Sequence, residues 1–230
     1  MRYVLAALSL FGLLQSTQVA AQNGPVVIEL YTSQGCSSCP PADAMLHDLA
    51  KRDDVIALAL HVDYWDYIGW EDVFGRPENT ERQHAYAQAA NAATVYTPQM
   101  IIGGVDYVIG SRPIQVMDAV LARSRQPNPF EVNLTRRGNS LMINAAPGAR
   151  GDYFVQLVRY KPEEIVAIGR GENAGRNLSY TNIVTSWDIV GRWDGRSALA
   201  LEADVTGDNP VVVIVQTSTN GPIVGAAELR

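Results

Sequence analysis

The sequence predicts an α/β domain followed by an all-β, sandwich-like domain. Near-continuous apolar runs at residues 26–31 and 55–62 have the pattern of strands covered on both faces, and helical patterns follow them. Residues 126–129, Gln-Pro-Asn-Pro, have the composition of a linker. Beyond them helical patterns are scarce and short strand-like runs dominate, at 153–158, 165–168, 199–201 and 211–215. We therefore expect domains at 24–125 and 130–230.

The first 21 residues are expected to be an export signal rather than part of the fold. Arg2 gives a positive start, residues 3–14 form an apolar run, and Val19-Ala20-Ala21 offers small residues for cleavage. The run is shorter than a bilayer-spanning helix needs, so we expect no membrane span in the mature chain. The protein is therefore predicted to be periplasmic or secreted.

The first domain is expected to follow the order β-α-β-α-β-β-α. Pro40 and Pro41 suit the first turn of a helix, and Met45, Leu46 and Leu49 follow at helical spacing. The expected strands are 26–31, 55–62, 95–104 and 105–110, the last two joined by a Gly-Gly turn, and the later helices are 79–93 and 113–123. Four apolar residues of the last helix are expected on one face: Ile114, Met117, Val120 and Leu121.

The charge of the chain argues against a polyanionic partner. The 230 residues carry a formal net charge of −6, and Lys51 and Lys161 are the only lysines. An acidic average field repels nucleic acid, and no basic run opposes it. We therefore expect no nucleic-acid partner.

Two cysteines, Cys36 and Cys39, are the only ones in the chain and form a C-x-x-C motif. An exported protein meets an oxidising environment, in which a disulfide persists. A structural disulfide usually closes a long loop, where the loss of unfolded-state entropy is large, and a bond across two residues restrains little. The pair is therefore better placed for chemistry than for stability.

The element order, the C-x-x-C after the first strand and Thr97-Pro98 before the third resemble the thioredoxin fold over residues 25–124. The resemblance implies a cis Pro98 facing the disulfide, with the backbone of Thr97 available to an extended substrate. It also makes Glu29, in the first strand, a candidate proton relay for the buried cysteine. The alternative for Glu29 is a structural hydrogen bond, because it lies seven residues before Cys36.

Longer strings are similar to a family of exported bacterial proteins, DUF1223. They are residues 29–43 around the cysteines, 61–66, 97–99 and the Gly-Glu-Asn-Ala-Gly-Arg of 171–176. This resemblance spans nearly the whole mature chain and implies a thioredoxin-like domain followed by a β-rich one. It implies no activity.

The two cysteines are expected to have different roles. A thiolate at a helix N-terminus is stabilised by the unpaired N–H groups and the helix dipole, which lower the pKa of the thiol. Cys36 should be the attacking nucleophile, and Cys39, one turn further in, should resolve the mixed disulfide. Ser37 and Ser38 are expected either to donate hydrogen bonds to the sulfur or to cap the helix.

A metal site and an inert disulfide are the alternatives to redox chemistry. Structural zinc needs four ligands, and the histidines lack the usual spacing to the cysteines. Copper(I) on two thiolates, aided by Met45 or Met100, stays open. We predict no cofactor and no metal. The three histidines are His47, His61 and His84.

An aromatic and acidic stretch at 63–72 supplies a candidate substrate rim formed by Tyr64, Trp65 and Trp70. The alternative is a loop packed on the core. Residues 169–175 are glycine-rich, but their spacing does not match a dinucleotide fingerprint, and we expect a turn between strands.

The sequence thus predicts an exported thiol–disulfide oxidoreductase that acts on protein thiols and disulfides through Cys36 and Cys39. The alternative is a non-catalytic binding module or a copper(I)-handling protein that uses the same cysteines. The direction of exchange, the oligomeric state and the role of the second domain have no signature in the sequence.

Overall fold

The computed structural model describes residues 24–230. The expected export signal, residues 1–21, lies outside them. Within the described part of the chain, no helix is both long and apolar enough to cross a bilayer.

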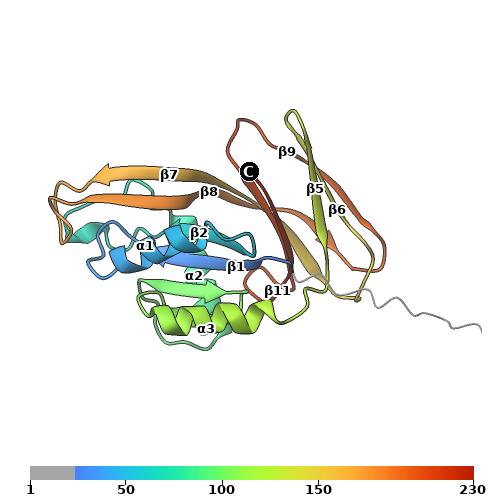
Figure 1. Ribbon diagram of the computed structural model, residues 1–230, viewed down its shortest axis with the longest axis horizontal. Helices are drawn as coiled ribbons and strands as arrows, with labels where there is room; N and C mark the ends of the chain where they lie inside the picture. The colour runs from blue at the N-terminus through green and yellow to red at the C-terminus, as the bar shows by residue number, and fades with distance from the viewer. Residues whose placement is uncertain (1–23) are drawn as a thin grey trace, which may run out of the picture.

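The first half of the chain contains the expected order of strands and helices (Figure 1). β1 pairs in parallel with β2 and antiparallel with β3, and β3 pairs antiparallel with β4. The elements are β1 (Val26–Thr32), α1 (Pro40–Leu49), β2 (Val55–His61), the 3₁₀ turn η1 (Asp66–Ile68), α2 (Pro77–Ala89), β3 (Gln99–Ile102), β4 (Asp106–Ile109) and α3 (Pro113–Ser124).

Proline sets several of these boundaries. Pro40, Pro77 and Pro113 each occupy the first position of a helix, where the missing N–H costs nothing. Helix α2 therefore begins two residues before the expected 79, and it ends at Ala89 rather than 93. Strand β3 begins at Gln99 rather than 95, directly after Pro98, which has no N–H to offer a sheet.

The expected apolar face of α3 differs from the observed one. Val116 and Val120, an i, i+4 pair, are buried against the sheet, whereas Ile114 and Leu121 are exposed. The four predicted residues do not share one buried face, because the helix packs on the sheet through Val116 and Val120, in the same core as Met100 of β3.

The second half consists of strands, and four of them extend the sheet of the first half. The eight-stranded sheet has the order β11-β10-β7-β8-β2-β1-β3-β4, and a separate three-stranded sheet has the order β5-β6-β9. The strands are β5 (Val132–Arg137), β6 (Ser140–Ala145), β7 (Tyr153–Ala167), β8 (Asn177–Trp193), β9 (Leu199–Asp204), β10 (Val211–Gln216) and β11 (Ile223–Leu229).

The three-stranded sheet packs on the β7–β10–β11 end of the large sheet, in a sandwich-like arrangement (Figure 1). Leu141 and Ile143 of β6 share a core there with Val155 of β7 and Val213 of β10. One sheet of the expected sandwich is thus continuous with the first half, because β8 lies beside β2 and pairs with it in parallel.

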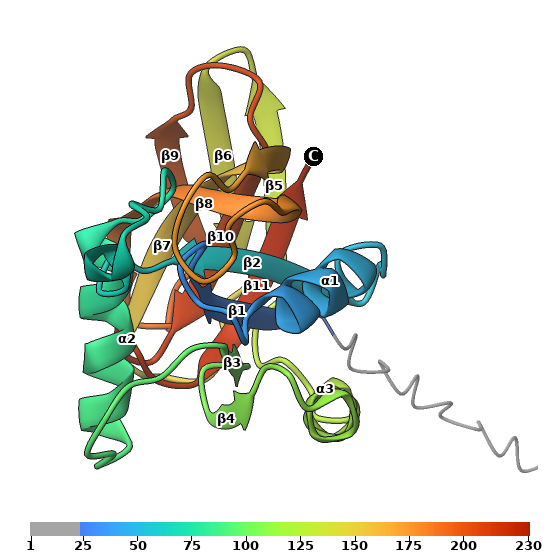
Figure 2. The same ribbon diagram turned by 90° about the vertical axis from the view of Figure 1, so that its left-hand side faces the viewer.

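Two cores lie on opposite faces of the β1–β2 region. On one face Ile28 and Leu30 pack under α1 and α3, and on the other Val27 and Tyr31 pack with Tyr86 of α2. Figure 2 shows α2 on the opposite side of the sheet from α1 and α3. Alternate residues of β1 therefore face different helices.

Candidate functional site

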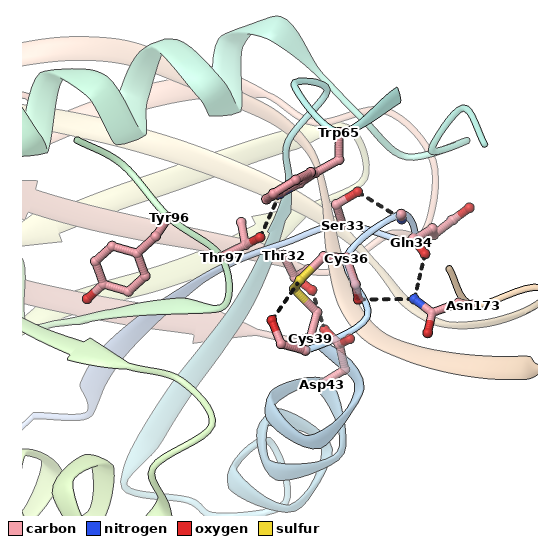
Figure 3. The surroundings of a disulfide bond; sticks show 12 residues. Thr32, Ser33, Gln34, Cys36, Cys39, Asp43, Trp65, Tyr96, Thr97 and Asn173 are labelled. Carbon is pink, nitrogen blue, oxygen red and sulfur yellow. Dashed lines mark hydrogen bonds between the residues drawn. A yellow bond between two sulfur atoms is a disulfide. The ribbon is translucent and has the colours of Figure 1, made fainter. Parts of the chain in front are cut away.

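The cysteines lie in the loop between β1 and α1 and form a disulfide (Figure 3). Cys39 is the N-cap residue of α1, and its carbonyl accepts the N–H groups of Ala42 and Asp43 at 2.8 and 3.1 Å. Cys36 lies in the same loop, three residues before Cys39. Cys36 is 4 % exposed and Cys39 is fully buried, so Cys36 is the more exposed of the two cysteines.

Ser38 contacts the disulfide. Its Oγ lies 3.4 Å from Cys36 Sγ, and the hydroxyl is the donor because a disulfide sulfur carries no hydrogen. The N-cap residue of α1 is Cys39, so neither serine occupies the capping position. Of the two expected roles for Ser37 and Ser38, the geometry favours donation to sulfur for Ser38.

The Thr97–Pro98 peptide bond is cis, as expected. The carbonyl of Pro98 accepts the N–H of Gly110 at 2.9 Å, which ties the loop to the end of β4. The hydroxyl of Thr97 accepts the indole N–H of Trp65 at 2.7 Å (Figure 3). Trp65 thus links the loop before β3 to the segment after β2.

The structure divides the three candidate rim residues. Trp65 packs against Gly35, next to Cys36, and stacks on exposed Tyr67 with ring centroids 6.2 Å apart. The indole of Trp70 donates to Gln34 Oε1 at 2.8 Å, also within the cysteine loop. The hydroxyl of Tyr64 instead donates to Gln83 of α2.

Glu29, the candidate proton relay, lies on the face of β1 that packs on α2, whereas the cysteines precede α1 on the other face. Its buried carboxylate accepts both Nε and Nη2 of Arg82, at 2.7 and 2.9 Å. It also accepts the hydroxyls of Tyr31 and Tyr86 at 3.0 and 2.7 Å. Burial, together with the Glu29 charge, raises the pKa of both tyrosines well above the usual value. These contacts match the structural alternative for Glu29, not a relay to Cys39.

Asp43 is the acidic residue that the fold places beside the cysteines. It lies one turn after Cys39 on α1, is buried, and accepts the Thr32 hydroxyl at 2.8 Å (Figure 3). Burial raises the pKa of the Asp43 carboxyl to about 7, although the neighbouring His61 and the bond from Thr32 lower it in part. Among the described residues, its Oδ2 has no hydrogen-bond partner. Asp43 also lines a pocket of about 430 Å³ between α1 and the β7–β8 strands.

A buried histidine–carboxylate pair, His61 and Asp72, lies near Asp43. His61 Nδ1 is 2.8 Å from Asp72 Oδ2, and both side chains are fully buried. The same oxygen of Asp72 accepts the backbone N–H of Gln34 at 2.8 Å. Burial would raise the pKa of the Asp72 carboxyl, but the His61 charge and these hydrogen bonds lower it on balance. The pair therefore anchors the cysteine loop to the end of β2.

One contact to the cysteine loop comes from the second half of the chain. The amide of Asn173, in the connection between β7 and β8, donates to the carbonyls of Gln34 and Cys36. Residues 169–175 are thus a connection between strands, as expected, but with a buried polar contact to the site. Sequence reasoning missed Asn173 and Asp43. The signals were the string 171–176, shared with the resembling family, and the helical position of Asp43 four residues after Cys39.

No group of three or more His, Cys, Asp or Glu side chains converges as a metal site within residues 24–230. His47 Nδ1 is 2.8 Å from Thr181 Oγ1, and His84 is exposed on α2. Met100 is buried in the core below α1 and α3, and Met45 packs against that core. Both methionines considered as copper(I) ligands therefore pack in or against the apolar core.

The protein is a mixed α/β protein with a disulfide at the N-terminus of its first helix. The sequence profile of DUF1223, described as a protein of unknown function, matches residues 27–216. The chain therefore belongs to this family.

A crystal structure of a protein from Agrobacterium tumefaciens is similar over most of its length, with 34 % identity and a TM-score of 0.79. The alignment covers 91 % of this chain and 96 % of that one. A hypothetical protein from Pyrococcus horikoshii OT3 has 7 % identity and a TM-score of 0.21, covering 43 % of this chain and 81 % of that one. No curated protein matches significantly.

Proposed function

We propose that the protein is an exported thiol–disulfide oxidoreductase with a thioredoxin-like first half, acting on protein thiols and disulfides in the periplasm or outside the cell. The observation that supports it most directly is the Cys36–Cys39 disulfide directly before the first turn of α1. Backbone N–H groups at a helix N-terminus favour the thiolate, which is the species that attacks a disulfide. Trp65, Thr97 and Tyr67 provide aromatic and polar surface beside it.

The exchange proceeds in two balanced steps. The thiolate of Cys36 attacks one sulfur of a substrate disulfide, forming a Cys36–substrate disulfide and releasing a substrate thiolate, which takes up a proton. The thiolate of Cys39 then attacks Cys36 Sγ, which closes the Cys36–Cys39 bond and releases the second substrate thiol. Two electrons pass from the protein dithiol to the substrate, and the reverse sequence oxidises a substrate dithiol.

Asp43 is suited to accept the proton of Cys39. A general base acts best when its pKa is near the working pH, and burial brings the pKa of Asp43 to about 7. The neighbouring pocket offers a route from this carboxyl toward solvent. The role proposed for Glu29 from the sequence therefore passes to Asp43.

Trapping the mixed disulfide tests this function. Cys39→Ser leaves Cys36 able to attack but removes the resolving thiol, so reduced Cys39→Ser protein should form a stable mixed disulfide with a reporter protein disulfide. Cys36→Ser is the matched control and should form none. Mass spectrometry under non-reducing conditions reads both. If neither variant forms an adduct and the wild-type disulfide does not equilibrate with glutathione, the oxidoreductase proposal is refuted.

The near-complete burial of both cysteines favours a second candidate, a binding module with an inert disulfide. A protein substrate must reach Cys36 past Trp65 and Ile68, which pack against Gly35. The same trapping experiment separates the two, because an inert disulfide yields no adduct with either variant.

A further inference from the structure

The connection between β7 and β8, residues 168–176, reaches across to the cysteine loop. Asn173 is 1 % exposed, and its Nδ2 donates to the carbonyls of Gln34 and Cys36 at 2.9 and 3.0 Å (Figure 3). These carbonyls belong to the peptide groups on either side of the Gly35–Cys36 unit. A single side chain therefore holds the backbone of Cys36 from both sides.

Asn173 is itself held in place. Arg176 Nη1 donates to Asn173 Oδ1 at 2.8 Å, which orients the amide so that its nitrogen faces the cysteine loop. The ends of the connection are closed by backbone bonds from Gly175 N–H to the Ile168 carbonyl and from Ile168 N–H to the Arg176 carbonyl. The Asn173 amide is thus preorganised, and the connection between β7 and β8 loses little further conformational entropy when this amide binds the two carbonyls.

The same connection also packs on the residue that holds Gln34. Gly171 has a φ of +75° and lies so close to Trp70 that a Cβ there would be 3.2 Å from Trp70 Cβ. Trp70 donates its indole N–H to Gln34 Oε1. Asn173 therefore holds the main chain of Gln34, and Trp70, which packs against the same connection, holds its side chain.

We propose that this connection is a clamp that sets the redox equilibrium of the Cys36–Cys39 pair, with Asn173 as its positioning residue. The inference deepens the proposed function, since it assigns control of the same cysteines to the second half of the chain. The observed clamp is that of the disulfide form. Its hydrogen bonds hold Cys36 where Cys39 can reach it, which raises the effective concentration of one sulfur at the other.

The reaction that reports the clamp is exchange with glutathione. The reduced protein and oxidised glutathione give the Cys36–Cys39 disulfide and two reduced glutathione molecules, so two electrons leave the protein and both thiol protons pass to glutathione. Loosening the Cys36 backbone in the reduced protein lowers the equilibrium constant for closing the disulfide. A purely structural Asn173 would lower the stability of the fold and leave that constant unchanged.

Asn173→Ala removes both bonds, and Arg176→Met releases the amide without touching the cysteine loop. The constant against glutathione should fall about tenfold in Asn173→Ala, which corresponds to a reduction potential about 30 mV less negative. Arg176→Met should shift it in the same direction by a smaller factor. Asn220→Ala is the matched control. Its Nδ2 donates to the Ala85 carbonyl and also joins the two halves, but away from the cysteines, so the constant should not change.

The constants are measured by thiol trapping and mass spectrometry across a glutathione series, after circular dichroism has shown that each variant is folded. A constant within twofold of wild type in folded Asn173→Ala overturns the proposal, as does an equal shift in Asn220→Ala. If Asn173→Ala does not fold, Arg176→Met decides in the same way. The proposed function fails if neither trapping variant forms an adduct and the wild-type disulfide does not equilibrate with glutathione, whereas the clamp fails if the pair does equilibrate and its constant is unchanged in Asn173→Ala, so the two failures give different results.

Discussion

Replacing Asp43 with asparagine should stabilise the protein, and increasingly so as the pH rises. The pKa of the Asp43 carboxyl is raised by burial from 3.8 to about 7. Between these values the folded protein holds a proton that the unfolded chain has lost. The folded state is therefore destabilised progressively as pH rises through this interval, and the loss is complete above the folded pKa.

The size of the effect follows from the shift. About three pKa units correspond to about 4 kcal/mol of unfolding free energy once the carboxyl is fully ionised. Part of this is already lost at about pH 5, so about 2–3 kcal/mol remains between about pH 5 and pH 8. The asparagine side chain in Asp43→Asn cannot ionise, and its amide oxygen can still accept the Thr32 hydroxyl that wild-type Oδ1 accepts.

Urea denaturation of oxidised wild type and Asp43→Asn at several pH values measures the difference directly, because other titrating groups largely cancel. The control is Asp48→Asn on the same helix. Asp48 is exposed, and its hydrogen bond from Lys51 lowers its pKa, so this variant should gain nothing as pH rises. If the advantage of Asp43→Asn does not grow between about pH 5 and pH 8, the carboxyl is not held protonated by burial and the reasoning fails.

Three further changes test other contacts. Arg82→Met leaves the buried Glu29 carboxylate without its ion pair and should cost about 3–5 kcal/mol in urea denaturation, whereas Arg76→Met, at an exposed pair, should cost under about 0.5 kcal/mol; equal losses would contradict this. Trp65→Phe keeps a ring but loses the bond to Thr97, so it should cost about 1 kcal/mol and speed reduction of the disulfide by dithiothreitol; an unchanged rate would show that Trp65 does not restrict access. Gly104→Ala, at φ +74° and against the Gly221 carbonyl, should lower stability by about 1–3 kcal/mol in thermal unfolding, and a neutral effect would count against this backbone geometry.

The order of elements in the first half was predictable because its signals are local. Apolar runs, proline at helix starts and the Gly103-Gly104 turn each act within a few residues. β8 was missed because its burial alternates irregularly along Asn177–Trp193, so no period of two is visible. In β7 the polar residues near Pro162 separate two apolar runs that form one strand.

The candidate site was predictable at the cysteines and at Thr97-Pro98, where the motif itself carries the information. The acidic partner was not. Asp43 has the sequence context of an exposed residue in a first helical turn, but Thr32 of β1 contacts its carboxyl and α1 packs against β8 of the second half. Glu29 stands in an apolar strand, which suggests burial, but the sequence does not tell which face it lies on.

The clamp also has a consequence for how the molecule is made. The bond from Asn173 to the Cys36 carbonyl joins residues 137 positions apart in the chain. Because the chain is synthesised from its N-terminus, the cysteines are made long before residues 168–176, which hold them. Long-range contacts of this kind form late in folding. A nascent or truncated chain would therefore carry the C-x-x-C motif without its mature backbone support. Truncation after residue 125 would also expose the edge of β2 that β8 covers, so the first half is a poor unit to express alone.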